Sequence, residues 1–282
     1  MPYTYSGACA LYYEHRGTSG SPLLLIAGYG SSLAGWPRVL IEQLSEQHRV
    51  ILFDNRGSGN SGKPDAPYVM DEFADDAAAI LDAMDVGSAH VMGVSMGGMI
   101  AQNFALRHPE RMRGLVLGCT APAALDSDEV VAPEQAVMET LLAPRCGDPA
   151  QDIRNLWPIV HSARYIDEAR DLLEQKLVDT EAYPKSPQYA LERQMQAIAE
   201  THNVLGRLCE LVAPTLVLAG TDDVLVPPQN SRVIADRIPH AHLIEYEGVG
   251  HDFLDEAGAR AAADILRFLA DVDSAFAVAP PA

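Results

Sequence analysis

The chain has 282 residues, 48% of them hydrophobic, and its formal net charge is −19. This length fits one large α/β domain or two small ones, and the hydrophobic share fits a protein with a packed core. Such a negative charge repels nucleic acid and anionic membranes, so we expect neither as a partner. The four cysteines lie far apart without metal-like spacing, which argues against a disulfide framework and a metal site. The composition leaves homo-oligomerisation open.

Short apolar runs alternate with helical patterns along most of the chain. The alternating stretch 3–17, bounded by glycines, predicts an antiparallel hairpin at the edge of a sheet. Apolar runs that end at turn residues predict buried strands over 22–28, 49–55, 89–95, 114–120, 214–220 and 241–248. Helical spacing predicts helices over 36–47, 70–86 and 255–272, and directly after residue 95. This order predicts a mostly parallel sheet with helices on both faces.

The alternation breaks between residues 121 and 213, where acidic, helix-like stretches are separated by prolines. This pattern predicts an inserted helical cap, called the cap segment (residues 121–213) below, between two parts of one core (1–120 and 214–272). Residues 273–282 are predicted to be a disordered tail. We find neither a secretory signal pattern nor an apolar run long enough to span a bilayer, and we expect a cytoplasmic protein.

The segment GVSMGG (residues 93–98) lies where the apolar run 89–95 meets a helical pattern. A serine between glycines at such a junction is typical of a nucleophile held on a strained turn. The helix that follows would favour an oxyanion at its N-terminus. Gly93 and Gly97 are expected where neighbouring backbone leaves no room for a side chain. The alternative is an ordinary turn with Ser95 as a helix N-cap, and the motif alone does not decide between them.

A serine nucleophile needs a base, and the base needs a carboxylate that orients it. Asp222 and Asp223 follow the predicted strand 214–220, and His251 follows the predicted strand 241–248. All three therefore lie at carboxyl ends of strands, in the order serine, aspartate, histidine. Spacing alone does not separate the two aspartates. The alternative for His251 is a loop histidine without function, although none of the other eight histidines follows a core strand with a flanking glycine.

Six segments resemble motifs of the α/β-hydrolase family: LLLIAGYGSS, FDNRGSGNS, GVSMGGMIAQ, FALRHPERM, LAGTDDVLVP and GVGHDF. The resemblance extends from Tyr3 to about Val272. It implies the α/β-hydrolase fold, with a mostly parallel central sheet, flanking helices and the helical cap. It also implies that Ser95 is the nucleophile, His251 the base and Asp223 the acid, because the family's acid falls three residues after the strand-ending glycine.

The resemblance further implies an oxyanion hole formed by the backbone N–H groups of Tyr29 and Met96. The sequence departs from the family at Ala27, where a histidine is usual, which puts the anchoring of this loop in doubt. Further candidates for substrate contact are Gly28, Trp157, Val224 and Phe253.

Two glycine-containing loops do not fit cofactor-binding patterns. In FDNRGSGNSGKP, Pro64 stands where a phosphate-binding loop needs a hydroxyl, and AGYGSSLAG lacks the dinucleotide fingerprint. We expect Asp54 and Arg56 to tie down loops near the site instead. The sequence implies no cofactor and no metal.

The resembled fold hosts several chemistries, so the choice depends on individual residues. Dehalogenases and epoxide hydrolases use a carboxylate where this chain has Ser95. Ring-fission C–C hydrolases usually carry tryptophan shortly after the catalytic histidine, where residues 252–254 are Asp-Phe-Leu, and proline iminopeptidases tend to have tryptophan in place of Met96. The chain is most similar to the carboxylesterase and enol-lactonase branch. The alternatives are a C–C bond or enol-lactone hydrolase of aromatic catabolism, and a non-catalytic ligand-binding receptor.

We expect the substrate to be a neutral ester or lactone of small to medium size. The cap segment holds eight basic and sixteen acidic side chains, so a carboxylate-bearing substrate would meet a repelling field. A cap arginine that points into the site, such as Arg145, Arg154 or Arg164, would reverse this preference.

Overall fold

The computed structural model describes residues 2–124 and 129–278, and no helix in those ranges is long and apolar enough to cross a membrane. Within these ranges the chain forms an eight-stranded sheet in the order β1-β2-β4-β3-β5-β6-β7-β8. The strands are β1 (Tyr3–Ser6), β2 (Cys9–Arg16), β3 (Pro22–Ile26), β4 (Arg49–Phe53), β5 (Ala89–Val94), β6 (Met112–Gly118), β7 (Thr215–Gly220) and β8 (His242–Tyr246). β1 and β2 form an antiparallel hairpin at one edge, β2 is antiparallel to β4, and the remaining neighbours in this sheet are parallel. The predicted edge hairpin and mostly parallel sheet are confirmed.

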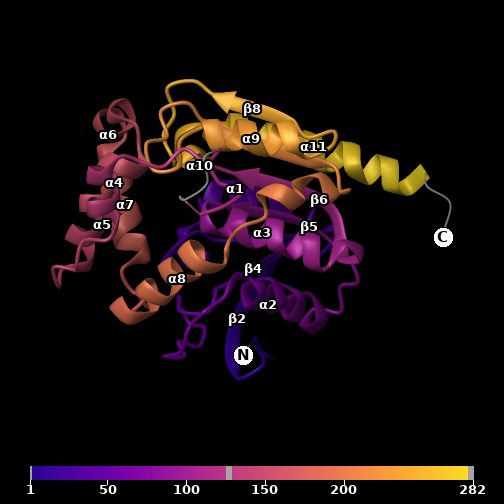
Figure 1. Ribbon diagram of the computed structural model, residues 1–282, viewed down its shortest axis with the longest axis horizontal. Coiled ribbons are helices and arrows are strands. Elements are labelled where there is room, and N and C mark those ends of the chain that lie inside the picture. The colour runs from indigo at the N-terminus through magenta and orange to yellow at the C-terminus, as the bar shows by residue number, and fades with distance from the viewer. Residues whose placement is uncertain (1, 125–128, 279–282) are drawn as a thin grey trace.

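Helices cover both faces of the sheet, because successive apolar side chains of each strand point to opposite sides. Leu23 and Leu25 pack with α1 (Arg38–Ser45) and α11 (Gly258–Val278). Leu24 and Ile26 face the other way, toward α2 (Met70–Ala83), α3 (Met96–Arg107) and α9 (Gln229–Arg237). Figure 1 shows α2 and α3 side by side on that face. The central strands are therefore buried on both sides, as their continuous apolar runs predict.

The chain between β6 and β7 carries the helices α4 (Gln135–Leu141), α5 (Pro149–Val160), α6 (Ala163–Glu168), α7 (Arg170–Thr180) and α8 (Gln188–Thr201), then η3 (Leu205–Glu210). α4 to α7 gather at one end of the molecule, and α8 runs from them toward the core (Figure 1). The excursion begins and ends at one point, where Ala123 and Asn203 form an antiparallel bridge. Hydrogen bonds from Val204 N to Pro122 O and from Ala124 N to His202 O, both 2.9 Å, flank this bridge. The division into core and cap domains stays a prediction.

The C-terminal residues differ from the expected disordered tail. α11 continues to Val278, and residues 279–282 lie outside the described residues. Asp273, inside the expected tail, accepts hydrogen bonds from Ser21 Oγ (2.5 Å) and His90 Nε2 (3.0 Å) and pairs with Arg113 (3.0 Å). The end of the helix is thus anchored to the amino ends of the strands, a contact that the local sequence does not reveal.

Candidate active site

Ser95 lies between β5 and α3 on a strained turn. Its φ of 58° and ψ of −124° are unfavourable for a residue with a side chain. A Cβ on Gly93 would lie 2.1 Å from the carbonyl oxygen of Gly97, and a Cβ on Gly97 would lie 2.0 Å from that of Ile26. Only glycine fits at either position. The Ser95 side chain makes no N-cap hydrogen bond to α3, which favours the strained turn over the ordinary N-cap.

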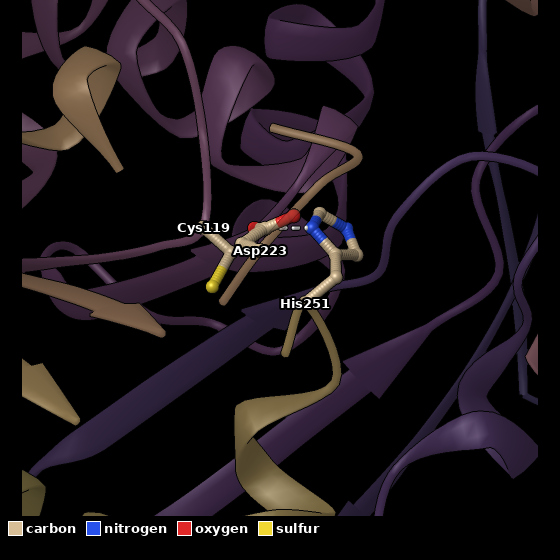
Figure 2. Close-up of side chains that lie close together, drawn as sticks. All are labelled: Cys119, Asp223 and His251. Atoms are coloured by element: carbon tan, nitrogen blue, oxygen red, sulfur yellow. Dashed lines mark hydrogen bonds and ion pairs between the residues drawn. The ribbon is translucent and has the colours of Figure 1, made fainter. Parts of the chain in front are cut away.

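His251 and Asp223 form a buried pair, with His251 Nδ1 2.7 Å from Asp223 Oδ2 (Figure 2). The other carboxylate oxygen of Asp223 accepts the backbone N–H groups of Leu225 (2.9 Å) and Val226 (2.8 Å). Asp222 is exposed, and its carboxylate accepts from Thr221 Oγ1 instead. Of the two adjacent acids, the structure therefore brings Asp223 to the histidine.

The pKa of His251 reflects two opposing effects. Burial lowers this pKa, but the negative charge and hydrogen bond of Asp223 outweigh burial, and the pKa lies above its ordinary value. An imidazole in this setting holds a proton more readily than a free one. This is the property needed of a group that takes a proton from a nucleophile and later returns it.

Ser95 and His251 line one cavity of about 620 Å³ between the sheet and the cap segment. Gly28, Tyr29, Met96 and Trp157 also line it. Among residues 2–124 and 129–278 no hydrogen bond joins Ser95 Oγ to the imidazole, and such bonds often tighten only when substrate is present.

Two candidate substrate contacts lie outside the lining of this cavity. Val224 has 45% of its surface exposed to solvent. Phe253 is fully buried and stacks on Tyr246, with ring centroids 5.9 Å apart, under Gly118 of β6. Phe253 starts α10 (Phe253–Glu256), so its ring turns into the core and not toward the cavity.

The loop after β3 packs directly against Ser95. A Cβ on Gly28 would lie 3.2 Å from the Cβ of Ser95, so glycine allows this approach. Within the described ranges, the backbone N–H groups of Tyr29 and Met96 have no hydrogen-bond acceptor, and Met96 begins α3, where N–H groups lack intrahelical partners. Both N–H groups are therefore able to donate a hydrogen bond to a further acceptor.

The loop is anchored without the histidine that Ala27 replaces. The carbonyl oxygen of Ala27 accepts a hydrogen bond from the buried side chain of Asn55 (2.9 Å). The neighbouring Asp54 accepts from Leu33 N (2.8 Å) and from the hydroxyl of Tyr183 (2.9 Å), which lies in the cap segment. Arg56 makes two hydrogen bonds to buried Asp76, at 2.7 and 2.8 Å. Asp54 and Arg56 thus fix loops, as the sequence predicts.

Cys119, in the apolar run 114–120, is buried beside Asp223. Its sulfur, a carboxylate oxygen of Asp223 and a ring nitrogen of His251 all lie within 4.8 Å of one another (Figure 2). Burial, and then the charge of Asp223, raise the pKa of the Cys119 thiol well above its ordinary value, so the thiol stays protonated. Three such groups resemble a metal-ligand set, but a protonated thiol is a poor ligand and the imidazole nitrogen already bonds to the carboxylate.

A cluster of polar residues joins the loop that carries His251 to the cap segment. Lys176 of α7 forms ion pairs with Asp255 and, at 3.9 Å, with Asp252, which directly follows His251. The backbone N–H of Asp252 donates to Val160 O (2.7 Å), and Glu256 accepts from Ser162 Oγ (2.6 Å). The Lys176 ammonium group lies among these acids, in the position that a metal cation would otherwise occupy. Together these contacts hold the loop that carries His251 against α5, α6 and α7.

Comparison with known proteins identifies a family and several relatives of this chain. Residues 21–144 and 148–258 match the model of a family described as alpha/beta hydrolase fold. A putative carbamate hydrolase RutD of Azorhizobium caulinodans is 34% identical, over 90% of this chain and 92% of its own. The rhodomycin D methylesterase DauP of Streptomyces sp. (strain C5) is 32% identical, over 82% and 85% of the two chains.

Two further proteins extend the range of names. A 2-hydroxymuconate semialdehyde hydrolase of Pseudomonas sp. (strain CF600) is 33% identical, over 93% of this chain and 91% of its own. The solved structure of an enol-lactonase from Burkholderia xenovorans LB400 superimposes with a TM-score of 0.82 at 23% identity, over 95% and 100% of the chains. The second likeness concerns the fold alone.

Proposed function

This chain belongs to the alpha/beta hydrolase family, and from that premise we propose that it is a serine hydrolase that cleaves a carboxylic ester or lactone. The observation that carries the proposal is that the groups needed for acyl transfer line one cavity. Ser95 on its strained turn and the imidazole of His251, oriented by Asp223, line the same cavity. A serine, an imidazole and an orienting carboxylate are the groups that acyl transfer requires.

In this proposal His251 Nε2 takes the proton of Ser95 Oγ as the oxygen attacks the substrate carbonyl carbon. The backbone N–H groups of Tyr29 and Met96 donate to the resulting oxyanion. Collapse of the tetrahedral intermediate breaks the bond to the alcohol oxygen, which takes the proton from His251 and leaves an acyl group on Ser95. A water molecule, deprotonated by His251, then releases the acid by the same route. In a lactone, the alcohol stays attached to the acyl chain.

The cavity lining supports neutral, partly apolar substrates. Many of its walls are aliphatic or thioether side chains: Met99, Val131, Met138, Leu141, Ile153, Leu156, Leu173, Leu177, Met195 and Ile198. Burial of an apolar acyl or alcohol part against such walls stabilises the complex without need of a charge. We further propose the cytoplasm as the location, since the four cysteines are free and suit a reducing compartment.

C–C bond or enol-lactone hydrolysis is the second candidate. The relative named 2-hydroxymuconate semialdehyde hydrolase favours it, because it matches nearly the whole chain at 33% identity. Against it stand residues 252–254, Asp-Phe-Leu, in place of the tryptophan that such enzymes usually carry. A parallel assay of a neutral ester and a ring-fission product separates the two. Turnover of neither would favour a ligand-binding receptor.

The central test is Ser95→Ala. We expect kcat for p-nitrophenyl acetate to fall by about 10⁴-fold or more, because no other group replaces the nucleophile. Labelling by a fluorophosphonate should be lost as well. Ser32→Ala is the matched control, since Ser32 also lines the cavity and its side chain makes no cap bond. More than a few per cent of wild-type turnover in folded Ser95→Ala would refute the assignment.

A further inference from the structure

Gln194 is a fully buried side chain of α8 that reaches the loop beside the nucleophile. Its Oε1 accepts a hydrogen bond from the backbone N–H of Gly30 at 2.8 Å. Its Nε2 donates to the carbonyl oxygen of Arg56 (2.9 Å) and to Ser58 Oγ (3.1 Å). One amide of the cap segment therefore joins two core loops that lie more than 130 residues away in the chain.

The hydrogen bond to Gly30 acts on the peptide plane next to the one that carries the Tyr29 N–H. Peptide groups are planar, so Tyr29 N–H turns together with the carbonyl of Gly28, and Gly30 N–H turns with the carbonyl of Tyr29. The Gly28 carbonyl accepts from Ser31 N (3.2 Å). The plane on the other side of Tyr29 is held by Gln194. Gly30 has a φ of +63°, and glycine adopts positive and negative φ about equally readily, so the residue type alone does not fix the orientation of this second plane.

Gln194 does not line the cavity, whereas Met195 and Ile198 of the same helix do. Direct contact with substrate therefore does not account for its burial. A buried amide with all these bonds satisfied fixes its partners in one arrangement. The partner nearest the site is the turn that carries Tyr29.

We propose that Gln194 is a positioning residue for the oxyanion hole. By fixing the Tyr29–Gly30 peptide plane, Gln194 keeps the backbone at Tyr29 in the conformation that points its N–H toward the oxyanion. Because Gln194 belongs to the cap segment, this conformation depends on the position of the cap segment relative to the core. The inference rests on the proposed function, since it assumes an oxyanion formed at Ser95. It supplies an anchor for the loop in which Ala27 replaces the usual histidine.

The test compares Gln194→Met with Gln196→Met. Met has the length of Gln but neither donates to Arg56 nor accepts from Gly30. Gln196 lies on the same helix, and its amide donates to Glu200 (3.1 Å). We measure kcat and KM for p-nitrophenyl acetate, thermal unfolding, and the Ki of an aliphatic trifluoromethyl ketone. Ser95 Oγ adds to the carbonyl carbon of this ketone, and the serine proton passes to His251. The former carbonyl oxygen of the ketone is then an oxyanion. Its affinity therefore reports on the oxyanion donors.

For Gln194→Met we expect kcat to fall about 10²-fold and the ketone Ki to rise by a similar factor, with KM within about threefold. Gln196→Met should match the wild type. If Gln194→Met does not fold, Gln194→Asn serves, because it keeps a buried amide that is one methylene too short to reach both loops. Unchanged kcat and Ki in a folded variant, or a change in KM alone, would overturn the inference. Ser95→Ala runs in parallel: its retained turnover would sink the proposed function, whereas its inactivity beside unaffected Gln194 variants would sink only this inference.

Discussion

Asp223 is held by hydrogen bonds on both carboxylate oxygens, whereas its neighbour Asp222 is exposed. Asp223→Asn would present an amide N–H to His251 Nδ1 and force the wrong tautomer of the imidazole. We expect kcat to fall by about 10⁴-fold. Asp222→Asn keeps the shape of an exposed side chain and should leave kcat nearly unchanged. Steady-state kinetics on both variants checks this. Equal losses, or the reverse order, would show that His251 is not oriented by Asp223.

The same pair sets the pH dependence of activity. His251 acts as a base only when neutral, so kcat/KM should fall as pH drops through its pKa. That pKa lies above the ordinary value of 6.5, so the loss begins at a higher pH than for a free imidazole. A profile of kcat/KM against pH on a neutral ester measures the midpoint. A flat profile down to mildly acidic pH would argue against a histidine base.

For single residues, the sequence predicts which side chains carry the chemistry better than it predicts which residues surround them. Strand ends locate Ser95 and His251, but Asp222 and Asp223 are separated only by family spacing, and in the structure by a contact. Val224 and Phe253 follow Asp223 and His251 by one and two residues, yet neither lines the cavity, because Val224 is exposed to solvent and Phe253, at the start of α10, is buried in the core. Gln194 is out of reach altogether, since its partners lie far away in the chain.

At the scale of elements, Lys176 ties α7 to α10 and to the histidine loop. Lys176→Met removes the cation but leaves Asp252 and Asp255 partly buried beside each other. We expect the free energy of unfolding to fall by about 2 kcal/mol, between the values for exposed and buried pairs. Lys185→Met is the control, because Lys185 also lines the cavity and bonds only to the Thr180 carbonyl within the described ranges.

The loss in Lys176→Met should depend on pH. Burial, and then the charge of Asp252, already raise the pKa of Asp255 to about 6 with the lysine present. Without the lysine this pKa rises further, so the folded state binds a proton more tightly than the unfolded state. The stability lost at pH 8 should therefore be partly regained as pH falls toward about 6. Denaturant unfolding at several pH values measures this, and a pH-independent loss would contradict it.

The elements themselves are read well from the sequence, because apolar periodicity reflects burial against the sheet. All six predicted core strands and the edge hairpin are present in the structure. The C-terminus is the exception: the helix runs through residues 273–278 because Asp273 meets Ser21, His90 and Arg113 across the sheet. No local pattern carries that contact.

For the whole molecule, the charge of −19 predicts which substrates reach the site quickly. We expect a neutral ester to have a higher kcat/KM than its ω-carboxylate analogue, with the gap narrowing at high salt as the field is screened. Of the three cap arginines that could reverse this preference, Arg145 is the one that opposes the expectation. It lines the cavity, whereas Arg154 is paired with Glu174 at 2.7 Å and Arg164 lies outside the lining. A carboxylate preference that persists at high salt in the wild type and disappears in Arg145→Met would overturn the expectation in favour of a specific clamp.

Because Ala123 and Asn203 pair with each other, residues 124–202 leave the core and return to it at one point. To the folding core this stretch is a closed loop, and the entropy of closing a loop grows only slowly, by about 0.6 kcal/mol for each doubling of length. A stretch of different length would therefore cost the core little in loop-closure entropy. Most of the aliphatic cavity walls named above lie in this stretch, so a change there would alter the space for substrate while the strands of the core stay the same.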